Sequence, residues 1–341
     1  MKKLGLSVCF ILVALMLLAG TAMAKDKVVV YTSLENEEVV DYLELAKAQL
    51  PDLDIQAIRL STGELGARML AEKDNPQADC IWGWAVTNMA GFVKEGMLEP
   101  YKAKGWEKIP DRFKAADGSW VAIDMYGAAF IINTKVMEAK NLPKPMSWKD
   151  LTNPVYKDML IMPNPASSGT GFLQVASLLE VLDPDYKTKA IKDNKAWDFL
   201  KELDKNMGQY IKSGSKPGKL TAAGEYAVGC SFAFVFSSLK KKGFPVEMII
   251  PEEGYAYELE ANALLKNAKN KAAAKKFLDW AISKGTMERY AKFKLGVTYP
   301  GIPGPKDLPQ LATIKLAPMD FPWQAENRTE ILEIWSNLFL R

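Results

Sequence analysis

Short apolar runs alternate with amphipathic stretches along the first hundred residues. Runs at 28–31, 53–58 and 78–82 are rich in β-branched and aromatic side chains, which is typical of buried strands. The stretches that begin near Glu35 and Ser61 carry apolar residues at helical spacing. Strands and helices that alternate with short turns predict an α/β fold with a mostly parallel sheet and helices on its faces. In such sheets, ligands bind at the carboxyl ends of the strands.

Two later apolar runs predict strands that pass between two lobes. The first covers 120–134, and the second, at 259–265, returns to the first lobe. A chain of 341 residues is long enough for two domains. Between the runs we expect strands at 159–162, 226–236 and 243–250, helices at 172–179 and 197–203, and a Gly/Ser/Lys loop at 210–219. Beyond them we expect helices at 272–282 and from about residue 326.

The N-terminus has the pattern of a signal peptide. Lys2 and Lys3 precede an apolar run at 4–20, and Thr-Ala-Met-Ala at 21–24 forms a cleavage signal. The apolar run is too short for a comfortable membrane span, so we expect an exported, periplasmic protein cleaved near Ala24. Without residues 1–24, 42 basic residues face 41 acidic residues, and no strongly basic block indicates nucleic-acid binding.

The sequence contains no histidine. This excludes Ser-His triads, Cys-His dyads and histidine general bases, so we expect a protein without catalytic activity, cofactor or metal. Cys80 and Cys230 remain in the exported chain, and both lie in apolar, strand-like runs. We expect buried free thiols, although export permits a disulfide between them.

The candidate binding chemistry is concentrated at a Pro/Ser/Gly turn at 163–171. The turn follows a predicted strand and precedes an apolar helix. Ser167, Ser168 and Thr170 can cap that helix, and Gly169 allows a ligand to approach the backbone closely. Free N–H groups and hydroxyls at a helix N-terminus form an anion site. The alternative interpretation is an ordinary capped helix.

A second helix start of the same kind lies earlier in the chain, at Ser61, Thr62 and Gly63. We expect it to face the same anion from the other lobe, so that two positive helix ends oppose each other across one site.

Five further residues are candidates for ligand contact, each with a structural alternative. Ser33 ends the first strand and could donate a hydrogen bond or belong to the turn. Trp84 could form a wall of the site or stack on a ligand cation, but could equally pack in the core. Tyr126 lies on the first crossing strand, where it contacts the ligand or packs at the hinge, and Ser213 lies in the Gly/Ser/Lys loop, where it binds an anion or is solvated. Glu258 lies near the second crossing and could bind a ligand ammonium or form a surface ion pair.

Several motifs occur in a consistent order over most of the exported chain. They are Val-Tyr-Thr-Ser at 30–33, Arg-Leu-Ser-Thr-Gly-Glu at 59–64, Asn-Pro-Gln-Ala-Asp at 75–79, Gly-Met-Leu-Glu-Pro-Tyr at 96–101, Asn-Pro-Ala-Ser-Ser-Gly-Thr at 164–170 and Pro-Glu-Glu-Gly at 251–254. This set resembles the type II periplasmic solute-binding proteins of ABC importers, in the branch that holds ferric-ion, 2-aminoethylphosphonate and sugar-phosphate binders.

The resemblance implies a two-lobed α/β fold with two crossing strands and a ligand cleft between the lobes. Residues 25–124 and 257–310 would form one lobe, 125–256 the other, and 311–341 a helical segment that packs on both. The resemblance also implies a monomer that captures a small solute and delivers it to a membrane permease.

For the solute, the resemblance favours a small anion, either a phosphonate like 2-aminoethylphosphonate or a phosphate ester. The ferric-ion binders carry two adjacent tyrosines after the Val-Gly of a late strand, but here Ser-Phe-Ala-Phe follows at 231–234. A ferric-ion-binding protein is therefore the alternative, with Glu64, Tyr255, Tyr257 and Glu258 as the remaining oxygen donors. The His-Asp pair of the hexose-phosphate binders aligns with Phe234 and Val235, which favours a smaller or more apolar organic part. An exported serine hydrolase that uses Ser167 or Ser168 is a distant alternative.

Overall fold

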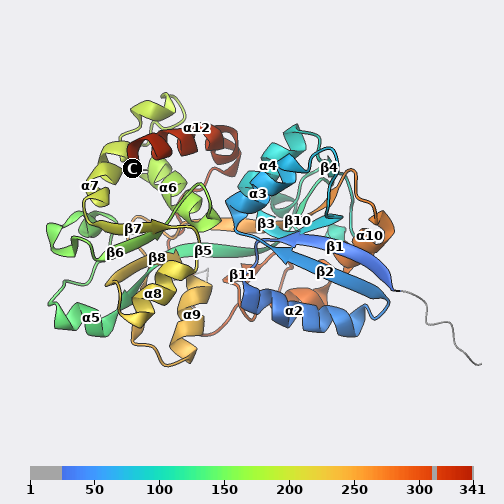
Figure 1. Cartoon of the computed structure of the whole chain (residues 1–341), viewed down its shortest axis with the longest axis horizontal. Coiled ribbons are helices and arrows are strands. Elements are labelled where there is room, and N and C mark those ends of the chain that lie inside the picture. Colours follow the sequence, from blue (N-terminus) through green and yellow to red (C-terminus); the bar gives the residue numbers. More distant parts are fainter. Residues whose placement is uncertain (1–24, 309–312, 340–341) are drawn as a thin grey trace, which may run out of the picture.

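The computed structural model describes residues 25–308 and 313–339, so the predicted signal peptide at 1–24 lies outside the described residues. Within them, eleven strands form one sheet in the order β2-β1-β3-β10-β5-β8-β6-β7, with β4, β9 and β11 paired to β10 or β5. Figure 1 shows this sheet running through the middle of the molecule, with helices above and below it in both halves. The predicted two-lobed α/β architecture is confirmed.

The first half follows the predicted β-α-β-α-β order. β1 pairs in parallel with β2 and β3, so that Val30 lies opposite both Ala57 and Cys80. Every residue of β3 is buried, as expected for a strand covered on both faces. The strands are β1 (Asp26–Thr32), β2 (Leu53–Arg59), β3 (Cys80–Ala85) and β4 (Leu98–Glu99). The helices are α2 (Asn36–Gln49), α3 (Thr62–Ala71), α4 (Val86–Lys94), α10 (Lys271–Ala281) and α11 (Lys284–Tyr290), with 3-10 helices η1 (Trp106–Lys108) and η2 (Asp111–Phe113).

Two antiparallel strands connect the halves, as the apolar runs predict. β5 (Val121–Asn133) is central in Figure 1 and pairs with β10 (Tyr257–Leu265) in the first half. Its later residues pair with β8 and β9 in the second half. The short strand β11 (Gly296–Val297) pairs with Met125 and Asp124 of β5, on the edge of β5 opposite to β10. The chain therefore passes between the lobes through a continuous sheet, which places the hinge next to any site between them.

The second half contains the remaining strands and helices. Its strands are β6 (Leu160–Pro163), β7 (Met207–Ile211), β8 (Val228–Phe232) and β9 (Val246–Ile249). Its helices are α5 (Thr134–Ala139), α6 (Gly169–Leu182), α7 (Ala196–Asp204), α8 (Lys216–Ala223), α9 (Ala233–Lys241) and α12 (Phe321–Phe339). The 3-10 helices are η3 (Lys149–Thr152), η4 (Pro154–Tyr156) and η5 (Ile191–Asp193).

Three sequence-based boundaries are wrong. The strand expected over 226–236 ends at Phe232, and Ala233 begins α9, because a short apolar run cannot by itself distinguish a strand from a helix. The loop expected over 210–219 contains the start of α8, whose first turn includes Pro217. α12 begins at Phe321, not near residue 326, because the Asp320 side chain accepts the N–H of Trp323 and caps the helix.

Each half has its own apolar core. The core of the first half contains the fully buried Tyr31, Trp82 and Tyr290, and the core of the second contains Phe130 and Trp335. Trp335 comes from α12, which also contacts α4 in the first half. The C-terminal helix is therefore built into the second core and touches both halves, and Figure 1 shows it above the sheet of the second half.

Cys80 and Cys230 are buried and free, as predicted, and lie on β3 and β8 in opposite halves. Burial raises the pKa of Cys230 to about 12 and that of Cys80 well above its usual range. Within the described parts of the chain, no helix is both long enough and apolar enough to cross a membrane.

Candidate functional site

A cavity of about 40 Å³ lies where the two halves meet the crossing strands. The first half lines it with the carboxyl ends of β1 and β2 and the start of α3, and the second half with the start of α6 and the end of β8. The crossing strands form part of its wall. Of the residues predicted to contact a ligand, the cavity brings together Ser33, Ser61, Thr62, Tyr126, Ser168, Gly169 and Thr170.

The start of α6 provides one side of the cavity. Ser168 is the N-cap residue in an extended conformation, and its hydroxyl accepts the N–H of Gly171 at 3.3 Å. This cap leaves the N–H groups of the first helical residues, Gly169 and Thr170, at the positive end of a 14-residue helix. Both residues line the cavity. The predicted strand-turn-helix arrangement thus directs a helix N-terminus at the space between the lobes.

The start of α3 faces it from the first half. Ser61 has the backbone conformation of an N-cap residue, but its side chain makes no capping hydrogen bond. Its hydroxyl therefore remains available where Ser61 and Thr62 line the cavity. The indole N–H of Trp84 donates to the Thr62 carbonyl at 3.0 Å and holds the helix start from behind.

Hydroxyl groups from both halves and from the hinge converge around two glycines. A Cβ atom placed on Gly169 would lie 2.7 Å from Thr62 Oγ1 and 3.1 Å from the Tyr126 hydroxyl. A Cβ atom on Gly214 would lie 2.6 Å from Thr170 Oγ1 and 3.0 Å from Ser168 Oγ. Because neither glycine has a side chain, a pair of hydroxyls lies close to the backbone at each, and all four hydroxyl-bearing residues line the same cavity.

Tyr126 retains its proton in this environment. The side chain lies on β5, opposite Glu258 on β10. Burial, together with the negative charges of Glu258 and Glu260, raises the pKa of the Tyr126 phenol well above its usual range. The phenol is therefore an O–H donor at neutral pH and suits an acceptor such as a phosphonate or phosphate oxygen.

Charged side chains line the rest of the cavity, and sequence reasoning did not identify them. Arg59 donates to the Leu34 carbonyl at 3.0 Å and forms an ion pair with Glu35 at 3.0 Å. Arg59 ends β2, so the rule that ligands bind at strand ends could have identified it. The other charged residues in the lining are Glu38, Glu260 and Lys294, which are far apart in the sequence and carry no motif.

The other five candidate residues lie near the cavity without lining it. Trp84 is fully buried behind α3, with its ring edge-on to Phe92. The Ser167 hydroxyl donates to the Lys212 carbonyl at 3.0 Å, and the Ser213 hydroxyl is 3.2 Å from that of Ser215.

Gly63 belongs to a set of contacts that hold the halves together across the cleft. Its N–H donates to the Ser167 carbonyl at 3.0 Å. Beside it are three contacts between side chains, Glu64 with Lys212 at 2.7 Å, Glu35 with Ser215 at 3.0 Å, and Glu37 with Lys219 at 3.3 Å. The structure is therefore a closed form, with helix starts of the first half in contact with the turn before α6 and with residues 212–219 of the second half.

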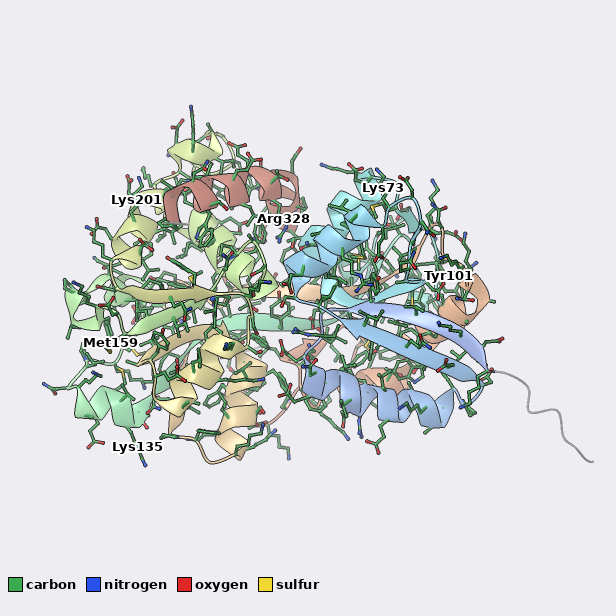
Figure 2. All side chains as sticks on the ribbon, in the orientation of Figure 1. Lys73, Tyr101, Lys135, Met159, Lys201 and Arg328 are labelled. Atoms are coloured by element: carbon green, nitrogen blue, oxygen red, sulfur yellow. The ribbon has the colours of Figure 1, made fainter. Side chains whose placement is uncertain are left out.

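Glu258 is buried behind the cavity, next to the C-terminal helix. Its carboxylate accepts the Thr87 hydroxyl at 2.7 Å and the Leu259 N–H at 2.9 Å. Arg328 of α12, labelled in Figure 2 at the boundary between the two halves, stacks 3.9 Å from the Phe172 ring centroid. The attraction of Glu258 partly offsets the burial that lowers the pKa of Arg328 to about 10.

The wall formed by the end of β8 offers no ligand for a hard metal ion. Phe232, Ala233 and Phe234 line the cavity here, and their side chains contain no oxygen or nitrogen. Within residues 25–308 and 313–339, no three Cys, Asp or Glu side chains are grouped in a way that could hold a metal ion.

Comparison with known proteins assigns the chain to a family. The family model for bacterial extracellular solute-binding proteins matches residues 79–322. The chain belongs to this family. A Haemophilus influenzae protein is 35% identical over 293 residues, covering 84% of this chain and 82% of that protein. A probable ABC transporter periplasmic-binding protein of Sinorhizobium fredii, y4fP, is 26% identical over 289 residues, covering 84% and 78% of the two chains.

A solved structure has the same architecture. The periplasmic binding protein AfuA of Actinobacillus pleuropneumoniae, with exogenous fructose-6-phosphate bound, superimposes with a TM-score of 0.84 at 29% identity, covering 92% of this chain and 98% of that one. The cleft in this solute-binding protein is therefore the expected place for a small solute, and the type II periplasmic-binding resemblance inferred from the motifs is confirmed.

Proposed function

We propose that this protein captures a small phosphonate or phosphate ester in the cavity between its lobes and delivers it to the membrane permease of an ABC importer. The observation that carries the proposal is the convergence of four hydroxyls, from Thr62, Tyr126, Ser168 and Thr170, around the space next to Gly169 and Gly214. These donors come from both lobes and from the hinge, so one tetrahedral anion could bridge all three parts.

The electrostatics of the two helix starts support an anion. α3 and α6 both direct their N-terminal ends at the cavity, and each helix end carries about half a positive charge. Neutral donors fixed by the fold can bind an oxyanion without a paired lysine or arginine, because several hydrogen bonds to one charged group add together. The phosphate ester named for the AfuA structure, fructose-6-phosphate, has this chemistry.

The dimensions of the site support a small solute. The cavity volume of about 40 Å³ in the closed form leaves little room beyond the anionic group, and Phe232 and Phe234 close one side. The mechanism is capture by closure: the open form binds the anion on one lobe, and the solute favours the closed form because only that form supplies donors from both lobes.

Native mass spectrometry of the freshly purified mature chain, followed by isothermal titration calorimetry, tests the proposal. Ethylphosphonate and ethyl phosphate are expected to bind with micromolar affinity, which corresponds to roughly −8 kcal/mol. Propionate and ethylsulfonate serve as matched non-phosphorus anions and are expected to bind at least tenfold more weakly. Heat with the carboxylate or sulfonate but with no phosphorus compound would contradict the proposal.

A further inference from the structure

A second hollow lies on the other face of the crossing strands. It is a groove of about 630 Å³, a volume typical of small-molecule sites. Met125 of β5 and Tyr257 and Leu259 of β10 line this groove, whereas Tyr126 of β5 and Glu260 of β10 line the solute cavity. Because successive side chains of a strand point to opposite faces, the groove and the cavity lie back to back across the hinge.

The two walls of the groove belong to different lobes. The first lobe contributes Phe113 of η2 and residues 296–302, which include β11. The second contributes Leu316, Met319 and Phe321, at the start of the helix α12 that is built into the second core. When two lobes rotate about a hinge, a movement that brings them together on one face separates them on the other. The groove is therefore widest in the closed form, and an occupant that fills it there opposes opening.

The surface of the groove is apolar and aromatic. Four aromatic rings line it, from Phe113, Tyr257, Tyr299 and Phe321. The rings of Tyr257 and Phe321 meet edge-on across the groove, with their centroids 5.5 Å apart. All four side chains remain partly exposed. A ligand with an apolar body would remove this surface from water, which is favourable in proportion to the apolar area covered.

Arg112 is the one charged side chain among the described residues that line the groove. It is exposed, and its guanidinium stacks 4.7 Å from the Phe113 ring centroid. Burial raises the pKa of Tyr257 on the floor of the groove, and the charge of Arg112 opposes that rise. In the described part of the chain Arg112 forms no ion pair, since the adjacent carboxylate of Asp111 is paired with Lys114 at 3.2 Å. The groove therefore offers a free guanidinium beside aromatic surface, which is complementary to a carboxylate on an apolar body.

We propose that this groove is a second binding site, for an amphipathic carboxylate whose apolar body packs on the four rings and whose head pairs with Arg112, and that its occupant favours the closed form. Charge complementarity decides the class of ligand. An uncharged apolar molecule leaves Arg112 without a partner, and a small inorganic anion leaves the rings in water. Because ligands at both sites select the closed form, each should tighten the binding of the other. This coupling rests on the proposed function, whereas binding in the groove does not.

Calorimetry with three matched compounds tests the groove as a site. 4-Phenylbutyrate carries both an aromatic ring and a carboxylate, 4-phenylbutanol lacks the charge, and butyrate lacks the ring. The unmodified mature protein is expected to bind 4-phenylbutyrate with a dissociation constant below roughly 1 mM, and each of the other two at least tenfold more weakly. No binding of 4-phenylbutyrate, or equal binding of all three compounds, would overturn the site.

Titrations in the presence of the other ligand test the coupling. With 4-phenylbutyrate at saturation, ethylphosphonate is expected to bind at least threefold more tightly, and 4-phenylbutyrate should gain the same factor from saturating ethylphosphonate. Unchanged affinities would overturn the coupling, and mutual exclusion would place 4-phenylbutyrate in the solute cavity and overturn the second site. If ethylphosphonate does not bind, the proposed function fails, and small-angle X-ray scattering with 4-phenylbutyrate alone then tests closure. A smaller radius of gyration is expected, and an unchanged one would overturn the link to closure.

Two variants locate the site. Arg112→Gln removes the charge and should weaken 4-phenylbutyrate at least fivefold while 4-phenylbutanol binds as before. Arg112 does not line the solute cavity, so this variant should bind ethylphosphonate alone as tightly as the unmodified protein. Met319→Glu places a negative charge on the opposite wall of the groove, at a partly exposed position, and should also weaken 4-phenylbutyrate at least fivefold.

Lys108→Gln is the matched control for the loss of charge. Lys108 is an exposed cation on the preceding 3-10 helix, η1, and does not line the groove. This variant should bind 4-phenylbutyrate as tightly as the unmodified protein. Far-UV circular dichroism and thermal unfolding verify the fold of each variant. Unchanged binding of 4-phenylbutyrate in both folded groove variants would show that the compound binds elsewhere and overturn the inference.

Discussion

The backbone N–H of Gly63 donates to the carbonyl of Ser167 at 3.0 Å and so joins the starts of two helices that belong to different lobes. These are the helix starts whose side chains line the cavity. A Cβ atom on Gly63 would lie 2.0 Å from the Ala166 carbonyl oxygen, far inside van der Waals contact. The lobes can therefore approach this closely only because residue 63 has no side chain, and the bond forms only in the closed form.

Gly63→Ala should prevent full closure. The alanine side chain fits the α3 helix itself, so the fold should remain intact while the lobes are held apart. We expect the affinity for the solute to fall at least tenfold, and small-angle X-ray scattering to show an unchanged, open radius of gyration at saturating ligand. Gly91→Ala in α4 is the control, because no atom lies within 4 Å of the added Cβ. Ligand-induced compaction of the Gly63 variant equal to that of the Gly91 variant would contradict the role assigned to this contact.

Thr170→Val should weaken solute binding with little effect on folding. The substitution keeps the shape of the side chain but removes one of the four converging hydroxyls. Loss of a hydrogen bond to a charged group is worth about 1.5–3 kcal/mol, so the dissociation constant for ethylphosphonate should rise by a factor of ten or more.

The chain supplies a matched control for that substitution. Thr221 is fully buried on α8, and its hydroxyl has no hydrogen-bond partner in the described structure. Thr221→Val should leave the affinity unchanged. Calorimetry on both variants, with thermal unfolding of each, separates a binding effect from a folding effect. Equal weakening in the two variants would show that Thr170 does not contact the solute.

Local sequence patterns predicted the two helix starts that line the cavity. The turn before α6 and the start of α3 each contain their signal in consecutive residues, and the topology of a parallel sheet places both at strand ends. The same rule could have identified Arg59. Local sequence patterns could not show that Ser167 and Gly63 contact each other, because that contact depends on how far the two lobes close.

The charged half of the site could not be predicted from local patterns. Glu38 looks like an ordinary acidic residue in the first turn of a helix, and Lys294 lies more than 250 positions away in a segment without a motif. Glu260 sits in a run that reads simply as a buried strand. Tertiary packing alone brings these groups together, because Glu38 comes from α2, Glu260 from β10 and Lys294 from the segment after α11. The end of β8 at Phe232 was not predicted for a related reason. Tertiary packing determines whether a short apolar run forms a strand or a helix.

Cys80 and Cys230 should not react with thiol reagents in the folded protein. Both are completely buried, and the raised pKa of each thiol removes the thiolate that such reagents require. In a 5,5′-dithiobis(2-nitrobenzoate) assay, we expect no rapid reaction of the native mature chain and release of two equivalents after denaturation in guanidinium chloride. One equivalent or none after denaturation without reductant would indicate that these thiols are blocked or oxidised.

Stability should fall as the pH rises from about 4.5 to 7. Burial raises the pKa of Glu258 to about 7, although hydrogen bonds from Thr87 and Leu259 and the charge of Arg328 oppose the shift. Burial also raises the pKa values of Glu38 and Glu180 to about 7. Each raised pKa means that the folded state keeps a proton that the unfolded state loses in this range. The free energy of unfolding therefore decreases as these protons leave.

Glu258→Gln isolates one of these groups, because an amide keeps the shape and cannot ionise. A pKa difference of two to three units corresponds to about 3 to 4 kcal/mol at most. Thermal unfolding at pH 5 and pH 7.5 should therefore show a smaller loss of Tm in the variant than in the unmodified protein. The exposed Glu44→Gln variant should lose as much Tm as the unmodified protein. An equal loss of Tm between pH 5 and pH 7.5 in Glu258→Gln and Glu44→Gln would contradict this prediction. The buried Glu258 would then ionise at its ordinary pKa, and another group would cause the loss of stability at higher pH.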